Sequence, residues 1–133
     1  MKKLFLYVFL ILLFYDNAIA ESKDRNLKLK QLFDQLKISN NISTILETEM
    51  KIWKIWSTHP TQENLTQTLT KGSDLMSKGK LEDAYKIFSS IINSDSDWAE
   101  GWNKRATVLY MMGRYQDSLN DIGEVLKRES RHF

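Results

Sequence analysis

The chain has 133 residues, of which 42% are hydrophobic and 27% charged, as in an ordinary globular protein. Its net charge is +2, with acidic and basic residues interleaved, so it has no clustered basic stripe and we expect no nucleic-acid partner. The absence of cysteine excludes disulfides, thiolate metal sites and thiol nucleophiles. One proline and five glycines are too few to separate many short strands, so composition favours an all-α fold.

The first twenty residues have the pattern of a secretory signal peptide. Two lysines precede an apolar run over residues 4–15, and Ala18 and Ala20 supply small residues before a cleavage site. An uncleaved membrane anchor is the alternative, but a spanning helix needs about 20 apolar residues and this run ends before Asp16. We therefore predict a signal peptide over residues 1–20, an exported protein in the periplasm or secreted, and no stable membrane span after cleavage.

Residues 21–60 predict a helical hairpin too degenerate to align with the rest of the chain. Two stretches with apolar residues at helical spacing flank the polar run of residues 39–41, and Thr44 with Glu47 offers a capping box for the second helix. Pro60 ends that helix, because the residue before a proline avoids the α region. This hairpin is expected to form an N-terminal cap on a helical stack.

A repeat of 34 residues organises the rest of the chain, residues 61–133, as two units at about 65–98 and 99–132. Within each unit, apolar residues at three- and four-residue steps predict two amphipathic helices. A glycine that ends the first helix in the left-handed conformation separates them, and Asp97 with Glu100 offers a capping box for the second unit. Small residues fall on small ones and apolar on apolar in the pairs Gly72/Ala106, Leu75/Leu109, Met76/Tyr110, Gly79/Gly113, Leu81/Tyr115, Ala84/Ser118, Phe88/Ile122, Ile91/Val125 and Ile92/Leu126.

These units resemble the tetratricopeptide repeat, in which W-x₂-L-G-x₂-Y, A-x₃-F and a final proline recur over 34 residues. Serines stand in place of the terminal proline in both units. The resemblance is especially close to repeats in short exported bacterial proteins, and it implies about six antiparallel helices in three hairpins after the signal peptide. The residues expected to pack at the signature positions are Gly72, Ala84 and Phe88 in the first unit, and Trp102, Ala106 and Ser118 in the second.

The resemblance also implies a function: a non-enzymatic scaffold that binds a peptide segment or helix of an envelope protein. The family presents a concave face built from the first helix of each repeat. Two of the residues expected there, Leu69 and Met76, are equally compatible with packing against neighbouring helices. The clamp with which some members hold a terminal carboxylate looks absent, because Leu69 and Ser73 stand where it needs long polar side chains. The expected partner-binding groove comprises Leu69, Ser73, Met76, Asn103, Thr107 and Tyr110.

The end of the repeat array suggests an alternative function. Repeat arrays usually end in a capping helix with a polar outer face, but the sequence stops where a third repeat would begin. Leu119, Ile122 and Leu126 are therefore expected to form an uncapped interface, through which a structural subunit self-associates as a homo-oligomer. Truncation relative to longer relatives is a simpler explanation.

No residues suggest chemistry. His59 and His132 are not at ligand spacing with each other or with a carboxylate pair, so we expect no metal site and no cofactor. The sequence contains no nucleophile elbow, phosphate loop or dinucleotide fingerprint, and we expect no catalytic residues. Trp53 and Trp56 share a helix face, where core packing is favoured over a ligand site. Trp102 is expected in the core, whereas Trp98 is expected either as a hydrophobic staple or exposed.

Overall fold

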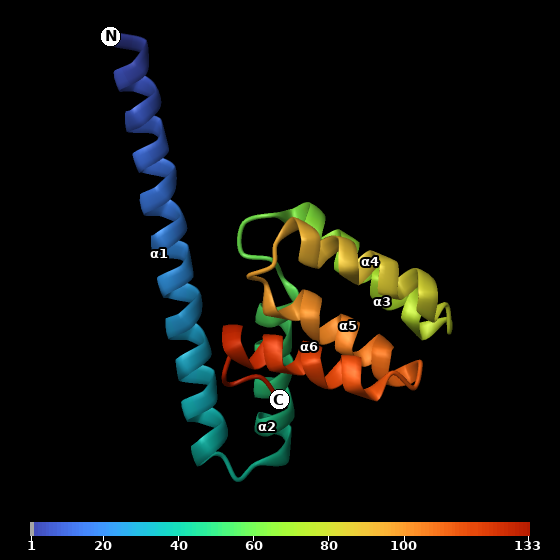
Figure 1. Ribbon diagram of the computed structural model, residues 1–133. Coiled ribbons are helices and arrows are strands. Elements are labelled where there is room, and N and C mark those ends of the chain that lie inside the picture. Colours follow the sequence, from blue (N-terminus) through green and yellow to red (C-terminus); the bar gives the residue numbers. More distant parts are fainter. Residues whose placement is uncertain (1) are drawn as a thin grey trace. The chain divides into compact units, whose positions relative to one another are not determined.

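A computed structural model describes the backbone of residues 2–133 and the side chains of residues 19–133. Over residues 2–133 the chain forms six helices and no strand, which confirms the all-α prediction (Figure 1). The predicted signal peptide, residues 1–20, lies almost wholly outside the described side chains, so its cleavage stays a prediction. Among the described residues, no helix is both long and apolar enough to cross a bilayer. The helices are α1 (Lys2–Ile38), α2 (Ile42–Ser57), α3 (Glu63–Ser77), α4 (Leu81–Ser94), α5 (Ala99–Met111) and α6 (Tyr115–Arg128).

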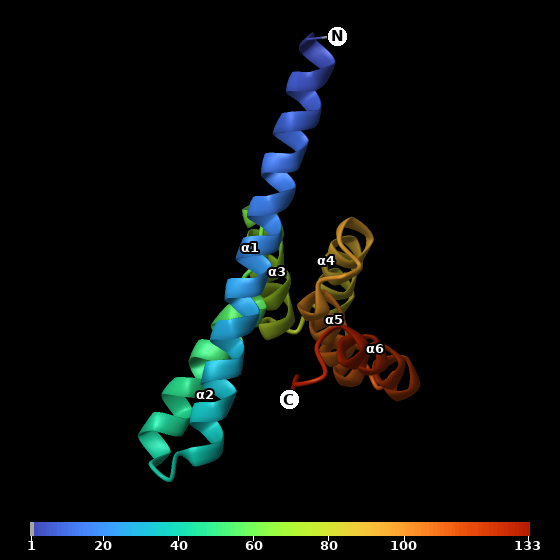
Figure 2. The ribbon, with the colours of Figure 1, turned by 90° about the vertical axis from the view of Figure 1, so that its left-hand side faces the viewer.

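The chain divides into two compact units, the first of which is Met1–Ile55. Here α2 returns beside the C-terminal half of α1 (Figures 1 and 2), and the Arg25 guanidinium donates to the Ile55 carbonyl oxygen. The predicted capping box at Thr44 and Glu47 is wrong, because α2 begins two residues before Thr44. Instead, the Asn41 side-chain oxygen accepts a bond from the Thr44 backbone N–H at 3.0 Å, which makes Asn41 the N-cap of α2.

The second unit, Trp56–Phe133, contains α3 to α6, and each of these helices packs on the next in chain order (Figure 1). The turns after α3 and α5 have the same geometry at a distance of 34 residues. Gly79 and Gly113 have φ values of +72° and +75°, as predicted for helix-ending glycines. The backbone N–H of the residue after each glycine donates a hydrogen bond to a carbonyl oxygen of the preceding helix. Lys80 N–H donates to Leu75 O and Arg114 N–H to Leu109 O, both at 2.9 Å. This is a Schellman motif repeated in register.

The first repeat has a fully buried crossing point between α3 and α4. Leu65, Leu69 and Phe88 share one apolar cluster with Ala84. A Cβ on Gly72 would lie 2.5 Å from Cε1 of Phe88, so only glycine lets the two helices approach with a phenylalanine between them. Gly72 and Phe88 therefore meet at this crossing, and Ala84 is buried in the same cluster.

The second repeat solves the same crossing with different side chains. Ala106 and Ser118 are buried, and the Ser118 hydroxyl donates to the Ala106 carbonyl oxygen at 2.8 Å. Trp102 is not a core residue as predicted, because it is only partly buried. The guanidinium groups of Arg105 and Arg128 both lie over its indole ring, at 5.1 and 4.8 Å from the ring centre. It therefore covers charged side chains at the surface of the repeat.

The predicted capping box at Asp97 and Glu100 is also wrong. Trp98 is the N-cap of α5, and among the described residues no side chain bonds to the amides that begin this helix. Trp98 is instead buried in the apolar cluster and donates its indole N–H to the Trp56 carbonyl oxygen at 3.0 Å. Glu100 is released from a capping role, and the contacts that it makes instead are central to the candidate site.

Candidate protein-binding face

One side of α5 carries a row of polar residues at three- and four-residue spacing, which we call the α5 face: Glu100, Asn103, Lys104, Thr107 and Tyr110. The Asn103 amide donates to Oε2 of Glu100 at 3.2 Å, and Lys104 Nζ lies 3.3 Å from Oε1 of the same carboxylate. Thr107 and Tyr110 are exposed at the other end of the row. The face therefore runs from a buried carboxylate to an exposed aromatic ring.

Glu100 is the unusual member of this row because its side chain is only 1% exposed. A buried carboxylate destabilises the fold unless donors surround it. Besides Asn103 and Lys104, the donor is His132, whose Nε2 lies 3.2 Å from Oε2 of Glu100. His132 comes from the C-terminal segment, which we define as residues 129–133, so this segment folds back onto the start of the α5 face.

Aromatic contacts hold the end of the C-terminal segment. The His132 ring stacks on Trp56 with a centroid distance of 4.2 Å and an interplanar angle of 13°. The Phe133 ring meets Trp56 edge-on at 5.3 Å. Trp56 is 4% exposed, so the indole ring is almost completely covered. Of the two tryptophans that share a face of α2, Trp56 belongs to the second unit and packs against His132 and Phe133 of the same unit, while Trp53 is partly buried.

A set of hydrogen bonds around Glu129, which we call the Glu129–Arg131 clasp, fixes the direction of the C-terminal segment at its start. Arg131 Nε donates to Oε1 of Glu129 at 2.6 Å, and the His132 N–H donates to the Glu129 carbonyl oxygen at 3.1 Å. Burial works to raise the pKa of Glu129, but the hydrogen bonds from Arg131 outweigh it and hold that pKa below its usual value. Just before the segment, Arg128 donates to the Ser96 carbonyl oxygen. Glu129 is therefore favoured as an anion in the folded chain.

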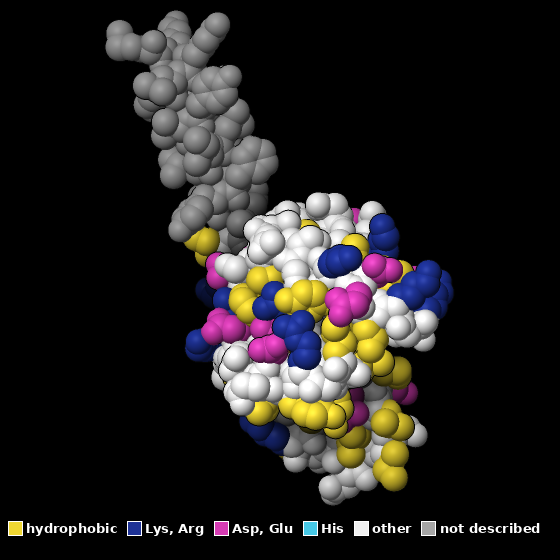
Figure 3. All heavy atoms as spheres, turned by 45° about the vertical axis from the view of Figure 1, so that its right-hand side comes forward, with side chains coloured by type: hydrophobic (Ala, Val, Ile, Leu, Met, Phe, Trp, Pro, Cys, Tyr) yellow, Lys and Arg dark blue, Asp and Glu magenta, His cyan; other side chains and the backbone are white. Residues whose placement is uncertain are grey.

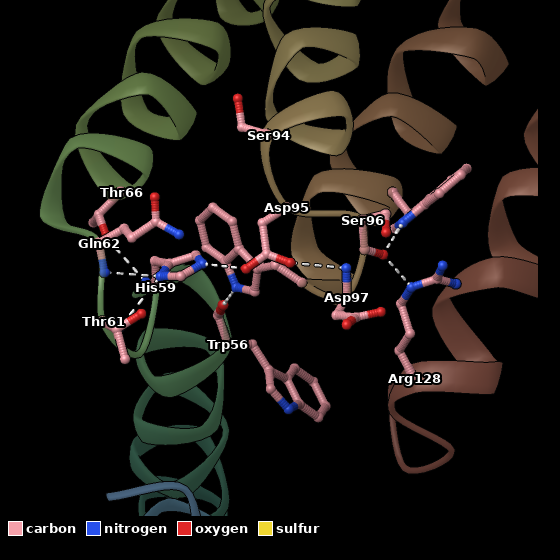
Figure 4. Close-up of polar contacts among 12 residues, drawn as sticks. Trp56, His59, Thr61, Gln62, Thr66, Ser94, Asp95, Ser96, Asp97 and Arg128 are labelled. Atoms are coloured by element: carbon pink, nitrogen blue, oxygen red, sulfur yellow. Dashed lines mark hydrogen bonds and ion pairs between the residues drawn. The ribbon is translucent and has the colours of Figure 1, made fainter. Parts of the chain in front are cut away.

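A second polar network joins the start of α3 to the loop after α4 (Figure 4). His59 is buried, and its Nδ1 accepts bonds from the backbone N–H groups of Thr61 and Gln62 at 3.2 and 2.9 Å. Nε2 of the same ring must then carry the proton, which it donates to Asp95 at 2.8 Å. This network ends α2 and starts α3, so His59 has a structural role.

Three of the six residues predicted to line the groove belong to α3, and they contribute little exposed surface. Leu69 is buried in the apolar cluster and Met76 packs against it. The hydroxyl of Ser73 donates to the Leu69 carbonyl oxygen at 3.0 Å, so it is used within the helix. In α5, Thr107 and Tyr110 are exposed and Asn103 is partly buried. The structure thus brings the α5 members together on one face.

Sequence reasoning missed the two most distinctive contacts of this face. Glu100 was interpreted as a capping residue. It is instead buried in the first turn of α5, next to the buried Gly101. His132 was set aside because it is not at ligand spacing with His59 or with a carboxylate pair, and its partner Glu100 lies 32 residues away in the sequence. The pair of ring-bearing residues His132 and Phe133 was the available signal that the C-terminal segment packs back.

The residues predicted to form an uncapped interface lie on the outer side of α6. Leu119, Ile122 and Leu126 are 65%, 37% and 45% exposed, and Tyr115 continues the same stripe one turn earlier. A Cβ on Gly123, beside this stripe, would meet no described atom within 4 Å. We call Tyr115, Leu119, Ile122 and Leu126 the α6 stripe. On the face drawn in Figure 3, hydrophobic side chains form separate patches among interspersed basic and acidic ones.

The basic residues near the C-terminus are engaged by carboxylates. Lys127 and Arg128 both pair with Glu124, at 2.5 and 2.7 Å, and Arg131 pairs with Glu129. Their positive charge is therefore largely neutralised locally and does not form an anion site. Within the described part of the chain, no three histidine or acidic side chains lie close enough together to hold a metal ion.

Comparison with known proteins supports the interpretation of the repeats. No family model matches the chain, and no solved structure matches it. A TPR repeat-containing protein from Rhizobium etli is 34% identical over 119 residues, which cover 88% of this chain and 55% of the relative. The chain thus spans about half the length of the curated relative that it matches. The 34-residue repeat of turns and helices, together with this relative, shows that the chain is an all-α stack of repeats that resemble the tetratricopeptide repeat (TPR).

Proposed function

We propose that the chain is an exported, non-enzymatic scaffold whose α5 face binds a peptide segment or helix of a cell-envelope protein. TPR proteins typically bind protein partners and are generally not enzymes, which supports a protein-binding role for this chain. The observation that carries the site is the row from Glu100 to Tyr110, which combines a buried carboxylate, an amide and an exposed aromatic ring on one helix face. Such a mixture gives orientation through polar groups and affinity through the aromatic ring.

Site-specific photo-cross-linking tests this proposal. A photoreactive side chain is placed at Thr107 or Tyr110, and at Lys86, which is exposed on α4, as the control. In cells of the source organism, the two α5 positions are expected to cross-link to the same envelope protein, and Lys86 is not. Equal cross-linking from all three positions would contradict a specific α5 face. Cell fractionation with N-terminal sequencing tests export, for which a mature chain that begins at Glu21 is expected.

The second candidate function is a structural subunit that self-associates through the α6 stripe. Its support is the exposure of four large side chains in a row on α6, a pattern that commonly marks an interface. Light scattering over a wide concentration range is the direct test, with a Leu119→Lys variant as the matched control. A mass that rises with concentration in the wild type but not in the variant supports self-association. A monomer at the highest concentration overturns it.

A further inference from the structure

The contact between the C-terminal segment and the α5 face has the composition of a peptide bound in a site. Its receptor groups are the carboxylate of Glu100 and the ring of Trp56, which are 1% and 4% exposed. Its ligand groups are a hydrogen-bonding imidazole and a phenyl ring on consecutive residues, His132 and Phe133. The His132 imidazole lies within hydrogen-bond distance of the Glu100 carboxylate, and the His132 and Phe133 rings both pack on the Trp56 indole. The site therefore makes polar and apolar contacts with the same two residues.

The receptor side restricts which ligands can fit. Oε1 of Glu100 faces Lys104, whereas Oε2 accepts from Asn103 and from His132. Without His132, Oε2 would keep one neutral donor in a site from which water is largely excluded. A planar group that donates a proton can satisfy Oε2 and stack on the face of Trp56 at the same time. Imidazole and guanidinium have both properties, whereas the compact ammonium group of lysine cannot stack.

The occupant side lies outside the helices that form the site. The segment begins after α6 has ended at Arg128. The ion pair between Glu129 and Arg131 joins two residues of the segment to each other. Phe133 is 53% exposed even in the docked position. The contacts of His132 and Phe133 with Glu100 and Trp56 are therefore made by side chains and are separate from the backbone bonds within α5 and α6.

We propose that Glu100 and Trp56 form a binding site for a peptide segment in which histidine or arginine directly precedes an aromatic residue. Residues 129–133 occupy this site in the free chain, and a partner segment displaces them. The inference rests on the proposed function, since it names the chemical class of the partner at the buried end of the α5 face. Because the chain's own segment is tethered, its effective concentration is on the order of millimolar, and a partner binds only if it outcompetes that segment.

Fluorescence anisotropy with a labelled pentapeptide of sequence Glu-Ser-Arg-His-Phe, which copies residues 129–133, tests the proposal. The full chain is compared with a His132→Ala/Phe133→Ala variant, in which the site is vacated. The variant is expected to bind the peptide at least about tenfold more tightly than the wild type, because the wild type carries its own competitor. A control peptide, Glu-Ser-Arg-Ala-Ala, is expected to bind neither chain, and an Arg-Phe ending is expected to bind the variant.

Two further measurements keep the test decisive. Circular dichroism shows whether the double variant retains its helices; if it does not, the single variant Phe133→Ala replaces it, since that ring is half-exposed. Glu100→Gln in the same background is expected to weaken peptide binding about tenfold or more, because a charge-assisted bond becomes a neutral one. Absence of peptide binding to a folded variant overturns the proposal, and so does equal binding to variant and wild type.

Failure of this inference can be told apart from failure of the proposed function. If the vacated variant binds the pentapeptide but Thr107 and Tyr110 cross-link to no envelope protein, the self-occupied site stands and the scaffold role falls. If cross-linking succeeds but the folded variant binds no pentapeptide, the scaffold role stands and the C-terminal segment is only a structural cap. Cross-linking that increases in the His132→Ala/Phe133→Ala variant supports both.

Discussion

The second helices of the two repeats, α4 and α6, have equivalent sequences in different surroundings. Each spans fourteen residues, and each starts directly after a Schellman turn. In α4, Phe88 and Ile92 are 0% and 6% exposed, because Phe88 packs against Gly72 of α3 and Ile92 against Gly101 of α5. Their equivalents in α6, Ile122 and Leu126, are 37% and 45% exposed. The apolar pattern of a repeat therefore specifies a helix face that can be covered, and the neighbouring repeat decides whether it is.

The first helices show the opposite asymmetry. On α5, Gly101 and Val108 are buried, and a Cβ on Gly101 would come within 3.0 Å of Ile91 in α4. One repeat earlier, the equivalent positions of α3 carry the exposed polar residues Gln67 and Asp74. Among the described residues, α3 thus presents polar side chains at these positions, whereas the α6 stripe is apolar.

The largest effect is expected from removing the ion pair that only the second repeat has. Arg105 donates to both oxygens of the largely buried Asp121, at 2.7 and 2.8 Å, and reaches Ser89 on α4. The bonds to Asp121 raise the pKa of Arg105, so the guanidinium stays charged. Arg105→Met leaves Asp121 buried without this partner, and we expect a loss of about 3–5 kcal/mol in the free energy of unfolding.

Urea denaturation of the two chains measures this loss. The matched control is Arg114→Met, which removes an exposed pair with Asp117. The control is expected to change stability by less than about 1 kcal/mol, because exposed pairs contribute little. Similar losses of stability in both variants would mean that the buried Arg105–Asp121 ion pair stabilises the second repeat no more than an exposed pair does.

A pair of equivalent truncations tests directly whether α4 and α6 differ in burial. Ile92→Ala removes a buried side chain from α4 and is expected to destabilise the chain by about 2–5 kcal/mol. Leu126→Ala, at the equivalent position of α6, removes a side chain that is already half in solvent, and about 1 kcal/mol or less is expected. Thermal unfolding at low protein concentration is the measurement. If Leu126→Ala costs as much as Ile92→Ala, the α6 stripe is covered in solution.

The two helix crossings combine small and large side chains differently, and this predicts that substitutions at Gly72 and Phe88 are energetically coupled. In the first repeat Gly72 lies against Phe88, and in the 34-residue alignment Ala106 and Ile122 stand at the equivalent positions of the second. Gly72→Ala alone forces a Cβ against the Phe88 ring and is expected to destabilise by about 1–3 kcal/mol. Combined with Phe88→Ile, which imitates the second repeat, the glycine substitution is expected to cost much less. A double-mutant cycle measures this coupling. If the free-energy changes of the two substitutions are strictly additive, the sizes of the two side chains at the crossing are not coupled.

Much of the fold was predictable because it depends on local patterns that repeat. The 34-residue shift predicted both left-handed glycines and the helices on either side, since a Schellman turn requires glycine wherever it occurs. Capping was predicted poorly: Asn41, not Thr44, caps α2, and α5 starts after Trp98. The same short polar motif fits several helix starts, and tertiary burial of Trp98 selects among them.

The candidate site was less predictable, because it joins residues that are distant in sequence. Asn103, Thr107 and Tyr110 were placed on one face correctly, since helical spacing determines it. The contact of Glu100 with His132 depends on how the chain turns after α6, which no periodicity encodes. Leu69 and Met76 were ambiguous for a different reason. Both the core and an apolar groove favour large hydrophobic residues at that spacing.

The smallest effect, a loosening of the C-terminal segment in acid, follows from Glu129. Its pKa is lowered in the folded chain, so the Glu129–Arg131 clasp contributes stability that is fully present above the unfolded pKa, about 4.3. That stability is lost as the pH falls through the folded value. Hydrogen exchange at the His132 N–H, which donates to the Glu129 carbonyl, is expected to show an extra opening below about pH 4. A Glu129→Gln variant should lack this pH dependence while the helices remain protected, because the amide that replaces the carboxylate does not titrate.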